Sequence, residues 1–170
     1  ADQSHAAGKR DAAGDPLGWH HSPATQITPD NVTRLTPAWT HRNGDMAAQT
    51  GTPSSVSAQS TPILLPPQSG GHLVYCTPFN RVIALDPETG RERWVYDPKV
   101  RRTSERPYRC RGVAYAEVPE AEAQGACRHR IYTATGDRRL IAIDARDGRP
   151  CAGFGGRGVV TLAEHERYGL

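Results

Sequence analysis

The chain has 170 residues, of which 36% are hydrophobic and 23% are charged, the balance of a soluble globular domain and not of a disordered chain. Its net charge is +3, but acidic residues are interspersed with the arginine clusters, and no aromatic platform for stacking bases accompanies them. This favours solvated loops over a nucleic-acid surface. No apolar run reaches the roughly 18 residues of a membrane-spanning helix, so we expect any export signal or membrane anchor to lie outside this chain.

The N-terminal part of the chain predicts little regular structure. Glycines and prolines follow one another closely through residues 1–34, which favours loops. Thr28 and Pro29 predict the start of one short helical turn, with Thr28 as its N-cap. A first strand containing Trp39 is expected at 37–42. The segment 43–60, rich in serine, threonine, glycine and alanine, is expected to be a loop.

Two groups of short strands follow, separated by turn residues. The first group is predicted at 61–65, 72–77, 81–86 and 92–97. The second is predicted at 111–117, 130–135 and 139–144, with a weaker fourth strand near 150–154. Residues 158–162 are expected to begin a further element. No segment keeps helical periodicity over three turns, so the predicted fold class is all-β.

One segment occurs twice, at 82–91 and at 140–149. Each copy is a short apolar strand followed by an aspartate and a turn that a glycine closes. Asp86 and Asp144 each precede the tight turn, where a carboxylate accepts backbone N–H groups, so we expect them to be structural and not catalytic. Four-stranded antiparallel units repeated in this way are typical of the blades of a β-propeller. Two blades cannot close a ring.

The cysteines and histidines give no metal-binding pattern. Cys76, Cys110, Cys127 and Cys151 form no C-x-x-C pair, which argues against zinc, a thioredoxin-type site and c-type haem attachment. The pairing of the four cysteines stays open: Cys76 is most simply a small buried residue, and Cys127 and Cys151, which flank one predicted blade, could form a disulfide. The histidines have no ligand spacing, so no metal site is expected here.

The repeat and its flanking segments resemble a known family. Ala84-x-Asp86-x-x-x-Gly90-x-x-x-Trp94 resembles the tryptophan-docking blade motif of the dehydrogenases that depend on pyrroloquinoline quinone (PQQ). The second copy has Ala152 where tryptophan is expected, and Phe154 is a candidate to fill that place. The segments 21–40 and 110–115 (Cys-Arg-Gly-Val-Ala-Tyr) resemble the membrane-bound glucose and quinate dehydrogenase branch of this family.

The resemblance implies that residues 1–170 are part of an eight-bladed quinoprotein propeller. In this division 1–60 is the N-terminal approach with a closing strand, 61–98 the first blade, 111–155 the second blade, and 156–170 the start of the next element. Glucose-oxidising members have a histidine shortly before the Cys-Arg-Gly motif. The stretch 106–109 is Arg-Pro-Tyr-Arg here, so the substrate stays open.

The resemblance also implies a cofactor and residues that would contact it. PQQ carries three carboxylates and an ortho-quinone, which require arginine forks and neutral donors. Arg111 matches the arginine that contacts the quinone from the inner strand of a blade, and Gly112 would let the backbone come close to the cofactor. Gln59 matches a position with an acidic or amide side chain against PQQ. The calcium ligands and the catalytic aspartate of the family belong to later blades, beyond Leu170, so this chain alone is expected to be inactive.

The function expected from the resemblance is oxidation of a sugar, polyol or alcohol in the periplasm by hydride transfer to PQQ. Electrons would then pass to ubiquinone or a cytochrome. The alternative is a non-catalytic propeller of PQQ-like repeats that binds proteins in the cell envelope. Such a scaffold has no reason to keep an axial arginine, so Arg111 and the motif around it favour the enzyme.

Overall fold

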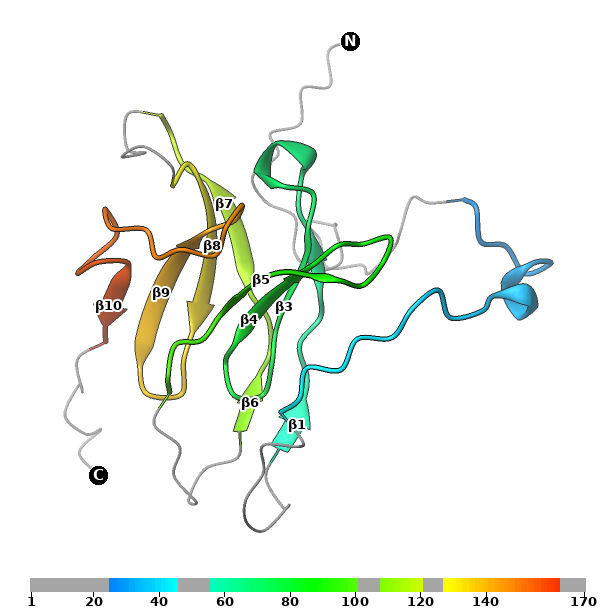
Figure 1. Ribbon diagram of the computed structural model, residues 1–170, viewed down its shortest axis with the longest axis horizontal. Helices are drawn as coiled ribbons and strands as arrows, with labels where there is room; N and C mark the ends of the chain where they lie inside the picture. The colour runs from blue at the N-terminus through cyan, green and yellow to red at the C-terminus, as the bar shows by residue number, and fades with distance from the viewer. Residues whose placement is uncertain (1–24, 46–55, 101–107, 121–126, 163–170) are drawn as a thin grey trace, which may run out of the picture.

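The computed structural model describes residues 25–45, 56–100, 108–120 and 127–162, and its strands form three sheets (Figure 1). Helical structure in these residues is limited to two 3-10 turns, η1 (Val32–Arg34) and η2 (Pro67–Ser69). No helix in these ranges is long and apolar enough to cross a membrane. The all-β prediction is therefore confirmed.

The first four-stranded sheet is made of consecutive antiparallel strands in sequence order. They are β2 (Ile63–Leu64), β3 (Leu73–Cys76), β4 (Val82–Leu85) and β5 (Glu92–Tyr96). All four lie inside the predicted ranges. β4 is buried at every position, which accounts for its unbroken apolar sequence.

The second four-stranded sheet confirms three predicted strands and corrects the fourth. Its strands, in order across the sheet, are β7 (Ala114–Glu117), β8 (His129–Ala134), β9 (Arg139–Asp144) and β10 (Val159–Thr161). The fourth strand is thus not at 150–154 but in the segment expected to begin a new element. Gly155 and Gly158 have φ values of +52° and +91°, outside the β region, so the chain makes further turns before it pairs with β9.

A two-stranded parallel sheet lies beside the blades and was not predicted. β1 (Val56–Ala58) pairs with β6 (Tyr108–Cys110), although 43–60 was expected to be a loop. Each strand has only three residues, too few for an alternating pattern to be recognised, and the two are far apart in the sequence, so no local signal reveals the pairing.

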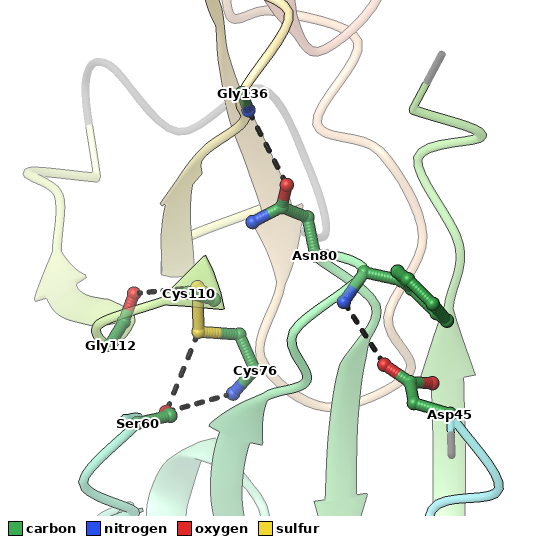
Figure 2. Close-up of a disulfide and its surroundings, with 8 residues drawn as sticks. Asp45, Ser60, Cys76, Asn80, Cys110, Gly112 and Gly136 are labelled. Atoms are coloured by element: carbon green, nitrogen blue, oxygen red, sulfur yellow. Dashed lines mark hydrogen bonds between the residues drawn. A yellow bond between two sulfur atoms is a disulfide. The ribbon is translucent and has the colours of Figure 1, made fainter. Parts of the chain in front are cut away.

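Side-chain contacts, and not strand pairing, hold the N-terminal segment 25–45 against the first sheet. The strand predicted at 37–42 does not form, because within the described residues its backbone has no partner strand. The predicted helical turn is found as η1, three residues later than Pro29. Asp45 is buried, accepts the backbone N–H of Phe79 at 3.0 Å (Figure 2) and forms an ion pair with Arg81, which fixes the end of this segment on the first sheet.

Tryptophan rings join each unit to the turn of the next one. The Nε1–H of Trp39 donates to the carbonyl oxygen of Pro87 at 3.1 Å, and that of Trp94 donates to the carbonyl oxygen of Ala145 at 3.3 Å. The rings lie over Gly90 and Gly148, whose φ values are +69° and +73°. A Cβ added there would come within 2.5 Å of the Trp39 ring and 2.6 Å of the Trp94 ring. Both positions therefore require glycine for two reasons, the positive φ and the close approach of the ring.

The missing third tryptophan is explained by strand register. Ala84 on β4 faces Trp94 on β5, and the equivalent Ala142 on β9 donates its N–H to the carbonyl oxygen of Gly158 at 2.9 Å. Gly158, not Ala152, therefore stands where the docking tryptophan stands in the first blade. The ring of Phe154 packs edge-on against Tyr132, the residue of β8 opposite Ala142, with ring centroids 5.5 Å apart. That Phe154 fills the place of the missing ring stays a prediction.

The core contains apolar residues of both four-stranded sheets. Val74, Cys76, Val82 and Ala84 come from the first sheet, Ile131, Ile141 and Ile143 from the second, and Trp94 packs against the cluster. A hydrogen bond between the sheets joins two hairpin turns: the side-chain oxygen of Asn80 accepts the backbone N–H of Gly136 at 3.3 Å (Figure 2). Each sheet thus buries one face against the other.

All four cysteines form disulfides. The Cys127–Cys151 pair, one of the possibilities left open by the sequence, is confirmed, with a Cα–Cα distance of 5.6 Å. Cys76 is buried as expected, but it is not simply a small buried residue, because it is bonded to Cys110 with a Cα–Cα distance of 5.9 Å. The chain-entropy model gives each bond a contribution of roughly 3 to 4 kcal/mol.

The two repeat aspartates differ in charge environment. In the first repeat the Arg93 guanidinium donates to Asp86 and, together with the N–H and hydroxyl of Thr89, lowers the pKa of Asp86 to about 2. In the second repeat Cys151 stands where Arg93 stands in the first. Burial therefore raises the pKa of Asp144, whose Oδ2 accepts no hydrogen bond from the described residues.

We expect Trp94→Ala to reduce the free energy of unfolding by about 3 kcal/mol, the lower end of the range for a large aromatic residue because the ring is partly exposed. Chemical denaturation of the intact protein measures this loss. Val95→Ala is the matched control, since Val95 is the next residue of β5 and is 41% exposed. Equal denaturation midpoints for the two variants would contradict the docking role of Trp94.

We expect the two repeat aspartates to titrate in opposite directions from their ordinary pKa of 3.8 in a carboxyl ¹³C NMR titration, Asp86 near 2 and Asp144 above 3.8. Because folding lowers the pKa of Asp86, this group stabilises the fold above pH 3.8 and loses that effect as the pH falls toward 2. Folding raises the pKa of Asp144, so its ionisation destabilises the fold as the pH rises above 3.8. Indistinguishable titrations would refute the difference between the repeats.

Candidate functional site

The structure brings two predicted cofactor residues together. In the parallel pairing of β1 with β6, Ala58 is opposite Cys110. Gln59 and Arg111 are the residues that immediately follow this last pair, one on each chain segment. Adjacent strands lie about 4.8 Å apart, so the two side chains begin from neighbouring backbone positions. Both residues are exposed.

Arg111 is not on a strand, contrary to expectation. Residues 111–113 link β6 to β7, where the chain leaves its parallel partner and begins antiparallel pairing with β8. The strand therefore starts at Ala114, three residues later than predicted. Gly112 lies in this link, and a Cβ placed on it would meet no described atom within 4 Å. The backbone at Gly112 is thus open to a close approach.

A disulfide connects this locus to the first blade (Figure 2). Cys110 directly precedes Arg111, and its Sγ lies 3.6 Å from the carbonyl oxygen of Gly112. Its partner Cys76 is the last residue of β3 and donates its backbone N–H to the Oγ of Ser60 at 3.2 Å. Ser60, which follows Gln59, and Cys110, which precedes Arg111, therefore both contact Cys76.

Ser60 and this disulfide were not predicted to belong to the site. The signals available were the even number of cysteines and the position of Cys110 beside the Arg-Gly pair. Neither could choose among the possible pairings, because the choice depends on which strands lie side by side.

The side chains of Gln59 and Arg111 can both donate hydrogen bonds, and neither is an acid–base residue. The Arg111 guanidinium is always charged and offers planar paired donors, and the Gln59 amide adds neutral N–H groups. Within the described part of the chain neither side chain has a hydrogen-bond or ion-pair partner. This set suits a planar ligand with carboxylate and carbonyl oxygens. Of the stretch 106–109, in which the resemblance implies a histidine for glucose-oxidising members, residues 106 and 107 lie outside the described ranges.

A hollow of about 290 Å³ lies between the N-terminal segment and the first sheet, and Ser60 and Cys76 are among the residues that line it. Its polar groups bond to one another: His41 joins the Tyr75 hydroxyl at 2.9 Å through Nδ1 and Glu92 at 2.9 Å through Nε2. Burial raises the pKa of Tyr75. These bonds hold the N-terminal segment against the sheet, and they explain the position of His41 without a catalytic role.

No cluster of three or more histidine, cysteine, aspartate or glutamate side chains in the described ranges could hold a metal ion. Asp86 and Asp144, the two aspartates of the repeat, bind their own turns: Asp86 accepts the N–H of Thr89 at 2.8 Å and Asp144 that of Arg146 at 2.8 Å. Their predicted structural role agrees with these bonds.

Comparison with known proteins agrees with this architecture. Residues 10–168 match the family described as the β-propeller domain of glucose, ethanol and alcohol dehydrogenases that use PQQ. The chain is 39% identical over 150 residues to a quinoprotein glucose dehydrogenase of Escherichia coli K12, a match that covers 85% of this chain and 18% of that protein. It is 36% identical over 154 residues to a quinate/shikimate dehydrogenase (quinone) of Acinetobacter baylyi, covering 82% of this chain and 18% of that protein.

A further relative is named as a glycerol dehydrogenase. The large subunit of a glycerol dehydrogenase of Gluconobacter oxydans is 35% identical over 149 residues, which covers 85% of this chain and 19% of that subunit. The chain thus spans about a fifth of the length of the curated relatives it matches. The strand order, the two docked tryptophans and the match over 10–168 show that the chain belongs to the β-propeller family of PQQ-dependent dehydrogenases.

Proposed function

We propose that this chain is the N-terminal part of a PQQ-dependent dehydrogenase of the glucose or quinate type. The proposed enzyme acts in the periplasm on a sugar, polyol or alcohol and passes electrons to ubiquinone or a cytochrome. The names of the relatives support this class: they include glucose, quinate/shikimate and glycerol dehydrogenases. The first and second sheets, with β1 and β6, supply one part of the wall of the cofactor site.

The adjacency of Gln59 and Arg111 carries the proposal. Two residues with donor side chains and no partner among the described residues follow the last pair of β1 and β6, and the backbone beside them at Gly112 is open. Their donors match the carboxylate and quinone oxygens of PQQ in charge and in hydrogen-bonding type. The residues present therefore fit this cofactor.

Each residue would have its own part in holding PQQ. The Arg111 guanidinium would bind an anionic oxygen with two parallel N–H donors, and the Gln59 amide would donate to a second oxygen. Gly112 would let the backbone lie against the ring system. When bound, PQQ accepts the hydride that the substrate alcohol loses. Calcium ligands and the aspartate that removes the substrate proton are proposed to lie beyond Leu170.

We expect Arg111→Ala in the full-length protein to weaken PQQ binding by about ten- to a hundredfold. A hydrogen bond to a charged group in a partly desolvated site is worth roughly 1.5 to 3 kcal/mol, and 1.4 kcal/mol corresponds to tenfold. Titration of the PQQ-free protein with PQQ gives the dissociation constant. Arg111→Lys should recover only part of the affinity, because lysine keeps the charge and loses the planar fork.

Arg149→Ala is the control for the loss of one positive charge. Arg149 is exposed on the turn of the second repeat, where its nearest described carboxylate, Asp147, lies 3.5 Å away. We expect its PQQ affinity to match that of the unchanged protein. Wild-type affinity in Arg111→Ala would refute the cofactor role and favour a protein-binding scaffold made of PQQ-like repeats.

A further inference from the structure

The sheet that carries Gln59 and Arg111 is too small to hold them by itself. β1 and β6 form three residue pairs, and in the described part of the chain neither is hydrogen-bonded to a strand of the four-stranded sheets. An isolated pair of strands is marginally stable at best in water, and parallel pairs are slightly weaker than antiparallel ones. The positions of Gln59 and Arg111 therefore depend on whatever joins this small sheet to a blade.

The Cys76–Cys110 disulfide makes that connection at the point where it matters for the site (Figure 2). Cys110 ends β6 and is bonded to Arg111 through the backbone, while Cys76 ends β3 of the first blade. Both cysteines are buried. On the other segment the Ser60 hydroxyl contacts Cys76 twice, accepting its N–H at 3.2 Å and lying 3.5 Å from its Sγ. One covalent bond and one hydroxyl thus fix the two residues that follow β1 and β6.

The second disulfide of the chain has a different place. Cys127–Cys151 joins the turn before β8 to the segment between β9 and β10, inside the second blade, and adjoins neither Gln59 nor Arg111. The two bonds span 34 and 24 residues of sequence. Loop length enters the chain entropy only as a logarithm, so both bonds are expected to stabilise the fold to a similar extent. They differ in what they hold in place.

We propose, building on the function proposed above, that Cys76 and Cys110 are positioning residues for the cofactor. Their disulfide holds Gln59 and Arg111 in the relative placement in which both bind one PQQ molecule. Loss of this bond therefore weakens PQQ binding more than another change that destabilises the fold to the same extent. Loss of Cys127–Cys151 lowers the stability of the fold and leaves PQQ binding unchanged.

The test compares C76S/C110S with C127S/C151S in the full-length protein. PQQ titration of the PQQ-free proteins should show at least tenfold weaker binding for C76S/C110S and a change of less than twofold for C127S/C151S, with similar shifts of the denaturation midpoint. Equal PQQ affinities of the two variants would overturn the positioning role. Failure of the wild-type protein to bind PQQ would instead overturn the proposed function, and the positioning role with it.

Adding Arg111→Ala separates positioning from a general structural effect. If the disulfide acts through Arg111, this change should weaken PQQ binding much less in C76S/C110S than in the wild-type protein. Equal factors in the two backgrounds would show that the disulfide and Arg111 act independently, and would refute the proposal.

If C76S/C110S does not fold, C127S/C151S answers the same question, because of the two disulfides in the described residues it keeps only Cys76–Cys110. The folded variant is reduced under native conditions, the reductant is removed by gel filtration, and PQQ is added without oxygen. We expect at least tenfold weaker binding after reduction and recovery after reoxidation. Affinity that does not change on reduction would overturn the proposal.

Discussion

An indole ring stacked on a glycine turn is the contact on which this architecture depends. Trp39 covers Gly90, and Trp94 covers Gly148, each with its N–H bonded to a carbonyl of the turn. Because the ring occupies the space where a Cβ would stand, the contact fixes both the distance and the order of the units. The core cluster that includes Val74 and Ile141 can then fill the space between two sheets held in this way.

The second blade keeps the repeat but changes how its turn is stabilised. In the first blade Asp86 is paired with Arg93, and the docking residue Trp94 lies on the same strand as Arg93. In the second blade Cys151 takes the place of that arginine and is bonded to Cys127, while Gly158 stands opposite Ala142. A covalent bond thus replaces an ion pair, and Asp144 is left with one carboxylate oxygen unpaired among the described residues.

The candidate site shows how donors from distant segments come together. Gln59 follows β1, Arg111 follows β6, and the cysteine that joins this pair to the first blade ends β3. Parallel pairing sets the two donors next to each other, and the disulfide ties them to the blade. The chemistry suited to such a place is recognition of a planar, oxygen-rich anion, which agrees with the cofactor of the family to which the chain belongs.

The sequence by itself determined the repeated strands and turns. Short apolar strands, an aspartate before each turn of the repeat and a glycine at its end are local signals. β3, β4, β5 and β9 lie within the ranges predicted from them, and β8 begins one residue earlier than predicted. The family resemblance could also be recognised from the sequence, because the motif from Ala84 to Trp94 and the Cys-Arg-Gly motif are each formed by one continuous stretch of residues.

The tertiary structure decided what no local signal carries. The pairing of β1 with β6 joins segments separated by the whole first blade, and a short strand of this kind forms only when its partner is already in place. The displacement of the fourth strand to β10 follows from two glycines with positive φ. The choice of Cys110 as the partner of Cys76 follows from which strand ends meet, a fact of three-dimensional proximity that spacing along the chain does not contain.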